Sequence, residues 1–269
     1  MKKILVTGSR GYIGKHLMHL LTMYPDYHVH ELDLVTGQDI RNEKSMESHF
    51  EKYDAVIHLA ALVRMNESVK EPLKYCETNI VGTMNVLRHI KHDNFIFAST
   101  GAAQEPNNPY AYSKRVAEDI VAQENKYTIF RFYNVTGTGG FPPTNPDGLL
   151  YNLIKATKTG VMNVFGDDYD TIDGTCIRDY VHVNDVCRSI IKAIENPSNR
   201  IEELAYGDPK TVSQIINLFK RTNNVDFKVN YLPRREGDSE SSYLKRPSEY
   251  MERKYCWGDL LKISGIDIS

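Results

Sequence analysis

Short apolar runs typical of β-strands alternate with amphipathic segments typical of helices through the first half of this chain. The strand-like runs are KKILVT, YHVHELD, DAVIHLA, NFIFAST and YTIFRF, and helical spacing marks YIGKHLMHLLTM, EPLKYCETNIVGTMNVLRHIKH and NPYAYSKRVAEDIVAQE. This rhythm predicts an α/β fold with a parallel sheet covered by helices on both faces. Ligands of such folds bind at the carboxyl ends of the strands, so the site is expected in the loops there.

The pattern loosens near Phe141, where Pro142, Pro143 and Pro146 interrupt the chain. We therefore expect a first domain over residues 1–140, to which a segment near 184–206 returns. Residues 141–269 are expected to form mainly a smaller, mixed α/β lobe.

Composition excludes several classes of partner. The 33 Lys and Arg residues nearly balance 35 Asp and Glu residues, so nothing favours nucleic acid or an anionic membrane surface. There is no apolar run long enough to span a membrane, and the apolar stretch after Lys3 is too short for a signal peptide. The four cysteines lie far apart, which predicts free thiols, no metal site and a cytoplasmic location.

A glycine loop joins the first strand to the first helix. Gly8, Gly11 and Gly14 follow a Gly-x-x-Gly-x-x-Gly pattern. Glycines there allow a tight turn and a close approach of the backbone to a pyrophosphate, and the helix N-terminus adds N–H donors. In this strand–turn–helix context the loop predicts a dinucleotide site and a Rossmann-type, doubly wound sheet. The alternative is a structural turn beside a surface aspartate.

Asp33 follows Gly14 by about 20 residues, at the end of the second strand. A carboxylate at this position accepts hydrogen bonds from the adenosine ribose and repels a 2′-phosphate, which favours NAD over NADP. Arg10 argues the other way, because its guanidinium could bind a 2′-phosphate.

Only residues 34–38 separate Asp33 from Asp39 and Ile40. A crossover between parallel strands needs a dozen or more residues. We therefore expect the sheet to be trimmed at its adenine side, without the usual next helix and edge strand.

Tyr110 and Lys114 stand one helical turn apart, on a helix that Pro109 can begin. A tyrosine pKa near 10 must fall by about 3 units, or about 4 kcal/mol, for the phenol to act as a base at neutral pH. One ammonium at about 4 Å supplies roughly that much at an effective dielectric near 20. Thr100, at the end of the NFIFAST strand, can hydrogen-bond a sugar oxygen beside this pair. His58 is expected to be a satisfied core histidine.

The strings FGDDYDTIDGTCIRDYVHVNDV, YLPRREGD and VIHLAALVRMNESVKEPLKYCETNIVGT resemble the UDP-glucose (UDP-galactose) 4-epimerases, within the extended short-chain dehydrogenases/reductases. The resemblance implies Tyr110 as the base, Lys114 and Thr100 as catalytic partners, tightly bound NAD and a UDP-sugar substrate. It also implies a homodimer built on the helices near Met84 and Val116. The implied cofactor contacts are Gly8, Arg10, Gly11, Tyr12, Ile13, Gly14, Asp33, Asp39, Ile40, Leu59, Ala60, Ala61, Asn79, Tyr110, Lys114 and Tyr133. The implied substrate contacts are Thr100, Asn134, Leu149, Asn163, Phe165, Arg178, Arg235, Asp238 and Ser242.

The resemblance implies a reaction without net oxidation. The sugar loses hydride at C4, rotates as a 4-keto intermediate and receives hydride on its other face. Ser242 falls where the family has either a bulky tyrosine or a small residue. The small form leaves room for an N-acetyl group at C2, so we expect UDP-GlcNAc and UDP-GalNAc to be accepted with UDP-glucose and UDP-galactose.

Three alternatives share parts of this pattern. A 4,6-dehydratase would need an acid next to Thr100, where this chain has Gly101 and Ala102. An NADP-dependent reductase of 4-keto-sugar nucleotides would suit Arg10. A non-enzymatic dinucleotide-binding regulator would not need Tyr110, so replacing that residue separates it from the enzymes.

Overall fold

A computed structural model describes residues 1–235 and 237–263 and divides into two compact units. The first unit comprises Met1–Arg131 together with Cys187–Glu202. The second comprises Phe132–Val186 and the chain from Glu203 onward. The second unit thus starts at Phe132, somewhat before the boundary expected at residue 141.

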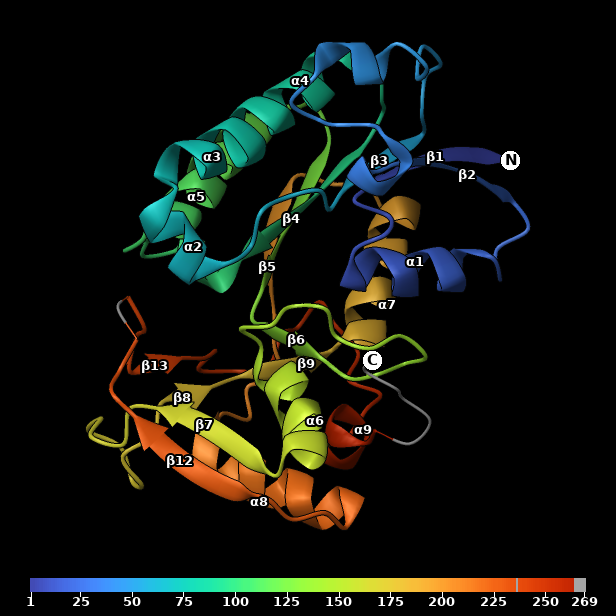
Figure 1. Cartoon of the computed structure of the whole chain (residues 1–269). Helices are drawn as coiled ribbons and strands as arrows, with labels where there is room; N and C mark the ends of the chain where they lie inside the picture. The colour runs from blue at the N-terminus through green and yellow to red at the C-terminus, as the bar shows by residue number, and fades with distance from the viewer. Residues whose placement is uncertain (236, 264–269) are drawn as a thin grey trace. The chain divides into compact units, whose positions relative to one another are not determined.

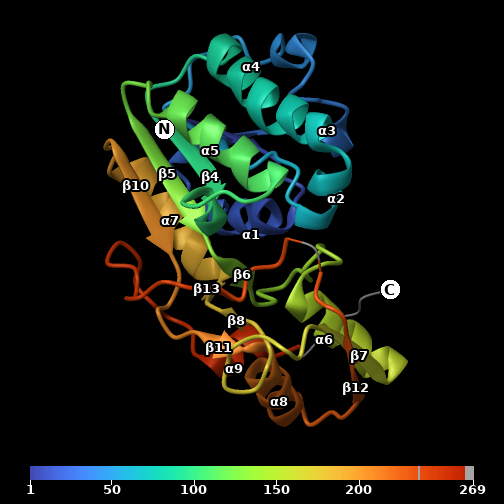
Figure 2. The same ribbon diagram turned by 90° about the vertical axis from the view of Figure 1, so that its left-hand side faces the viewer.

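The first unit is built on a six-stranded sheet with the order β10-β5-β4-β3-β1-β2 (Figure 1). The pairs β1–β2, β1–β3 and β3–β4 are parallel, as the alternating pattern predicts. Figure 2 shows β10, β5 and β4 side by side. The strands are β1 (Lys2–Thr7), β2 (Tyr27–Leu32), β3 (Ala55–His58), β4 (Phe95–Thr100), β5 (Tyr127–Phe132) and β10 (Arg200–Leu204).

Helices cover both faces of this sheet, with α1 and α7 on one side and α2 to α5 on the other (Figure 1). A five-residue π-helical turn, η3 (Glu77–Val81), joins α3 to α4. The helices are α1 (Tyr12–Leu21), α2 (Met65–Lys70), α3 (Pro72–Cys76), α4 (Gly82–His89), α5 (Pro109–Val121) and α7 (Val183–Glu195), with short 3₁₀ turns η1 (Leu34–Thr36), η2 (Glu43–Met46) and η4 (Gly101–Ala103).

The core of the first unit lies between the sheet and helices α4 and α5. Leu5, Val56 and Phe97 from the strands are fully buried there, against Val86 of α4 and Ala117 of α5. Burial of such side chains contributes roughly 1.5–3 kcal/mol each. Packing therefore fixes the ends of β1, β3 and β4, where the loops of the site begin.

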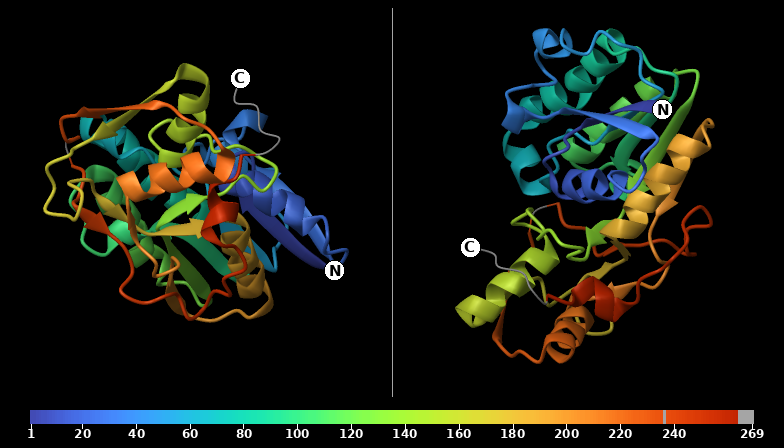
Figure 3. Two further views of the ribbon diagram at one scale, coloured as in Figure 1. Left: turned by 90° about the horizontal axis from the view of Figure 1, so that it is seen from below. Right: turned by 90° about the vertical axis from the view of Figure 1, so that its right-hand side faces the viewer.

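The sheet ends at β2, whose only paired strand among the described residues is β1 (Figure 3, right). After β2 the chain makes the turns η1 and η2 and returns directly to β3. The expectation of a trimmed edge is confirmed in the described part of the chain.

The second unit is a mixed α/β assembly of small sheets. Strands β12 and β7 pair in parallel, β8 lies between β11 and β13, and β6 pairs with β9. Its strands are β6 (Asn134–Thr136), β7 (Val161–Phe165), β8 (Ile177–Arg178), β9 (Tyr180–His182), β11 (Lys210–Thr211), β12 (Lys228–Leu232) and β13 (Ser241–Ser242), and its helices are α6 (Leu149–Thr159), α8 (Val212–Asn223) and α9 (Trp257–Leu261).

The four cysteines carry free thiols, of which Cys76 and Cys256 are exposed. Over the part of the chain that the structure describes, every helix is too short or too polar to cross a lipid bilayer.

Candidate active site

The glycine loop brings the backbone of β1 against the loop that follows β3. Gly8 has φ of +71°, and a Cβ there would stand 2.6 Å from the backbone nitrogen of Ala60. A Cβ on Gly14 would stand 2.2 Å from the carbonyl oxygen of Gly8. Helix α1 begins immediately after Gly11, which makes no side-chain cap. Only hydrogen-sized side chains fit this cradle, and they leave N–H groups of the helix end available to an anion.

Asp33 is nearly buried at the end of β2, and its carboxylate is held in place by two backbone N–H groups. Arg10 donates to Oδ2 at 2.8 Å and Val35 donates to Oδ1 at 2.8 Å. Each oxygen keeps a further lone pair for another donor. The carboxylate is therefore oriented beside the glycine loop, where a ribose could donate to it.

A cavity of about 400 Å³ extends from the glycine loop along the carboxyl ends of β1, β2 and β3. Most of the predicted cofactor residues line it: Gly8, Arg10, Gly11, Asp33, Asp39, Ile40, Leu59, Ala60 and Ala61. The sequence reasoning missed its remaining lining residues, which are Leu32, Leu34, Val35, Gln38, Arg41, Leu62, Lys74 and Thr78. The two consecutive apolar residues Leu34 and Val35, directly after Asp33, were a sequence signal that could have found part of this set.

Asp39 and Arg41 form an ion pair on the wall of this cavity. Arg41 Nη2 lies 2.6 Å from Asp39 Oδ2, and the hydrogen bonds from Arg41 lower the carboxyl pKa. Ile40 between them is buried, packed where a Cβ on Gly82 would contact it at 2.7 Å. The two residues thus have different roles. Asp39 forms the ion pair on the cavity wall, whereas Ile40 packs against Gly82 and fixes the loop.

Asn79 is buried in the π-helical turn and uses its whole amide to hold the loop after β3. Its Oδ1 accepts the N–H of Leu62 at 2.8 Å, and its Nδ2 donates to the Leu62 carbonyl and to Ser113 Oγ. Asn79 therefore ties the cavity loop to α5. Its neighbour Thr78 lines the cavity instead.

Tyr110 and Thr100 meet at the start of α5. Asn108 caps this helix by accepting the N–H of Ala111 at 3.0 Å, and Pro109 occupies its first turn. The Tyr110 phenol and the Thr100 side chain form a hydrogen bond. Burial raises the pKa of Tyr110 to about 12, and this hydrogen bond opposes the rise.

Lys114 does not lower the pKa of Tyr110 in this structure, contrary to the expectation from their spacing. Its ammonium lies over the Phe97 ring, 4.0 Å from the centroid. Burial lowers the lysine pKa to about 7, and the charge of Glu118 opposes this. A side chain that is buried and partly neutral supplies little of the positive field that the spacing argument assumed.

A buried ion pair lies one turn beyond Lys114 on α5. Arg131 Nη2 donates to Glu118 Oε2 at 2.7 Å, and its Nε contacts both carboxylate oxygens. Ser99 also donates to Glu118. The Ser99 hydroxyl is therefore engaged inside the unit, which leaves Thr100 as the hydroxyl beside Tyr110.

His58 is a satisfied core histidine, as expected. Its Nδ1 lies 2.7 Å from Thr7 Oγ1 and its Nε2 lies 3.0 Å from Thr83 Oγ1. Thr83 donates its own hydrogen to the Asn79 carbonyl, so it accepts from Nε2–H. The imidazole is neutral, and burial lowers its pKa to about 3.

In the second unit, predicted substrate residues gather around β8 and β13. The Arg235 guanidinium stacks 3.8 Å over the Phe165 ring. Asp238 is close enough to Arg178 and Arg235 for both to oppose the rise that burial causes in its pKa. Ser242 pairs with Arg178 in the β8–β13 register. A stacked ring and two guanidinium groups suit a base and a diphosphate.

Other predicted residues of this unit lie elsewhere or are engaged within it. Asn134 donates its side-chain amide to the Asp179 carbonyl at 2.8 Å, and Tyr133 donates to Glu203. Asn163 is exposed on β7, on the same strand face as Phe165, and Leu149 begins α6.

Tyr12 and Ile13 stand at the first turn of α1 in the first unit, outside the cavity lining.

Comparison with known proteins identifies the family of this chain. The model of the NAD dependent epimerase/dehydratase family matches residues 4–206. The UDP-glucose 4-epimerase of Rhizobium leguminosarum bv. trifolii is 29% identical over 88% of this chain and 87% of its own. That of Schizosaccharomyces pombe is 30% identical over 87% of this chain and 84% of its own.

Solved structures give the same result. The UDP-glucose 4-epimerase of Thermotoga maritima, in a structure with UDP-glucose, has a TM-score of 0.84 and 29% identity, over 96% of both chains. The Bifidobacterium longum enzyme, in complex with NAD⁺ and UDP, has a TM-score of 0.83 and 25% identity, also over 96% of both chains. Because the family model matches well over half of its residues, the chain belongs to the NAD dependent epimerase/dehydratase family.

Proposed function

We propose that this protein is a UDP-hexose 4-epimerase that keeps NAD bound through its reaction cycle. The observation that carries the proposal is the Tyr110–Thr100 hydrogen bond in the same unit as the dinucleotide cradle. The cradle fits the cofactor, because Gly8 and Gly14 let the backbone of the loop pack more closely than any side chain would allow, which is the tight turn that a pyrophosphate-binding loop needs. The similarity to UDP-glucose 4-epimerases over most of the chain supports the substrate class.

The bound nicotinamide supplies a reversible hydride acceptor. Tyr110 would take the proton of the sugar 4-hydroxyl as C4 loses hydride, and would return that proton to the C4 oxygen when hydride comes back to the other face of C4. Thr100 hydrogen-bonds the phenol and the sugar oxygen. The pKa of about 12 in the free protein must fall before the phenol can act as a base. Because Lys114 supplies little positive field in the free protein, the positive charge of the bound cofactor is the main available source of that fall.

Arg178, Arg235, Phe165 and Asp238 would hold the uridine diphosphate, which leaves the sugar free to turn. The reductase alternative rested on the short loops and on Arg10, and the Arg10 guanidinium is paired with Glu31 here. The epimerase is therefore the better supported function.

The first experiment incubates the purified protein with UDP-glucose, with no cofactor added, and separates the 4-epimers by chromatography. Tyr110→Phe should lower kcat at least about 100-fold while NAD stays bound. Tyr112→Phe is the matched control, because Tyr112 lies on the same helix but is 56% exposed, and it should keep full activity. A Tyr110→Phe protein as active as the parent would refute the proposed base.

The breadth of substrate is proposed from Ser242, which is half-buried beside Arg178. Ser242→Tyr should abolish conversion of UDP-GlcNAc and leave conversion of UDP-glucose within about threefold, because a phenol fills space needed only by the N-acetyl group. Ser241→Tyr places the same bulk on the other face of β13 and should change neither rate. Equal loss of both activities in Ser242→Tyr would contradict the steric argument.

We also propose a homodimer formed through α3, η3, α4 and α5. These neighbouring elements expose apolar side chains, namely Leu73, Val81, Met84, Tyr112 and Val116. Apolar side chains gathered on adjoining helices are typical of a subunit interface. A cytoplasmic location is proposed as well, on the ground that all four cysteines carry free thiols.

A further inference from the structure

Two acidic residues project from the same side of the end of β2, because they stand two positions apart. Asp33 accepts the backbone N–H of Arg10. Glu31, one step earlier on that side, accepts the hydroxyl of the buried Ser9 at 2.8 Å. Both carboxylates therefore hold the glycine loop, and they do so at the end of the cavity where an adenosine ribose would lie against Asp33.

Glu31 also holds the Arg10 side chain in a two-pronged ion pair. Arg10 Nε lies 2.9 Å from Glu31 Oε2, and Arg10 Nη2 donates to Oε1 at 3.0 Å. A parallel pair of such bonds is the geometry that a guanidinium also forms with phosphate. The Arg10 side chain is 49% exposed and Arg10 lines the cavity, so a ligand phosphate that reached the guanidinium would share it with the Glu31 carboxylate.

We propose that Glu31 is a specificity-determining residue that disfavours NADP by balancing the charge of the Arg10 guanidinium and placing a carboxylate beside it, an inference that rests on the proposed use of a dinucleotide. A 2′-phosphate adds about two negative charges at neutral pH. A phosphate bound to Arg10 would lie next to the Glu31 carboxylate, whose negative charge repels it whether or not the ion pair opens. The adenosine of NAD carries only a hydroxyl there, which Asp33 accepts without disturbing the pair.

Glu31→Gln tests the proposal, since glutamine keeps the size of the side chain and removes its charge. NADH and NADPH would be titrated separately by their fluorescence into protein freed of nucleotide. The variant should bind NADPH about tenfold more tightly than the parent and NADH within about twofold. The gain should shrink at high salt, because the Arg10–phosphate attraction is exposed to solvent. Dinucleotides that copurify with each protein, identified by chromatography, give a second measurement.

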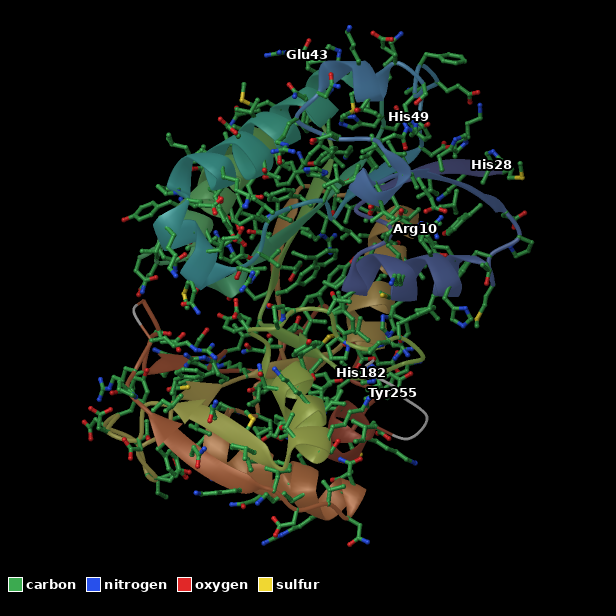
Figure 4. All side chains as sticks on the ribbon, in the orientation of Figure 1. Arg10, His28, Glu43, His49, His182 and Tyr255 are labelled. Atoms are coloured by element: carbon green, nitrogen blue, oxygen red, sulfur yellow. The ribbon has the colours of Figure 1, made fainter. Side chains whose placement is uncertain are left out.

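Two further variants isolate the cause. Arg10→Ala added to Glu31→Gln should remove the gain in NADPH affinity, because no guanidinium remains. Glu43→Gln is the matched control, at a position labelled in Figure 4. Glu43 pairs with Arg88, both side chains are more than half exposed, and neither lines the cavity. It should alter neither affinity. A thermal unfolding scan confirms that each variant is folded.

The outcomes separate the inference from the function on which it rests. If the parent binds NADH and Glu31→Gln gains no affinity for NADPH, the inference is wrong and the epimerase proposal stands. A parent that binds NADPH as well as NADH also overturns it. If a folded Glu31→Gln protein loses both nucleotides, Glu31 only supports the loop. A parent that binds neither nucleotide would overturn the proposed function itself.

Discussion

His58 makes the stability of the first unit depend on pH. Burial lowers its pKa in the folded protein to about 3, against about 6.5 in an unfolded chain. The unfolded state therefore takes up a proton first, so the stability is fully present above pH 6.5 and is lost as the pH falls below it. The expected loss is about 1.4 kcal/mol for each pH unit below that value.

Urea unfolding of the parent and of His58→Gln at pH 7, 6 and 5 measures this effect. The variant lacks the titrating ring, so its free energy of unfolding should fall less steeply with acid, even if it starts lower. Equal slopes in the two proteins would mean that other groups, such as the partly buried His30 and His49, carry the acid sensitivity.

At the scale of elements, the turn between β1 and α1 tolerates no side chain. Gly8→Ala meets both the cost of positive φ and the Ala60 backbone at 2.6 Å. Gly160 has a similar φ of +73° but no atom within 4 Å of a Cβ, so Gly160→Ala should cost only about 1 kcal/mol. Gly8→Ala should cost at least about 2 kcal/mol more and lose bound dinucleotide, as measured by thermal unfolding and by nucleotide content. Similar losses of stability in the two variants would show that the positive φ, and not the close approach to Ala60, causes the destabilisation of Gly8→Ala.

The sequence predicts these elements because local rules govern them. Alternating patterns place β1 to β5, the glycine spacing places the cradle, and the short link after Asp33 predicts the trimmed edge. Such local patterns do not indicate which side chains that are distant in the sequence will contact one another. Spacing puts Tyr110 and Lys114 on one helix face, but packing carries the ammonium to Phe97. Likewise, nothing in the sequence pattern indicates that Glu31 pairs with Arg10, or that the Asn79 side chain hydrogen-bonds the loop after β3.

For the whole molecule, the proposed dimer gives a prediction about assembly. Met84→Glu places a charge among the exposed apolar side chains of α3, α4 and α5, and burying an unpaired charge costs several kcal/mol. Sedimentation equilibrium should show a dimer for the parent and a monomer for this variant. Ile172→Glu alters an exposed residue of the second unit and should leave the dimer intact. A monomeric parent, or a dimeric Met84→Glu protein, would refute the interface.

The buried Glu118–Arg131 pair has a consequence for how this protein can change over generations. Losing either partner alone leaves a buried charge unpaired, at a cost of about 3–5 kcal/mol, whereas replacing both by apolar residues can be nearly neutral. Ser99 adds a third member, because it donates to the same carboxylate. A single substitution at Glu118 or Arg131 is therefore strongly destabilising, and a tolerated change requires both residues to be exchanged. Among relatives, the three residues should be inherited together or exchanged together, so the packing beneath α5 should vary less than the surface around it.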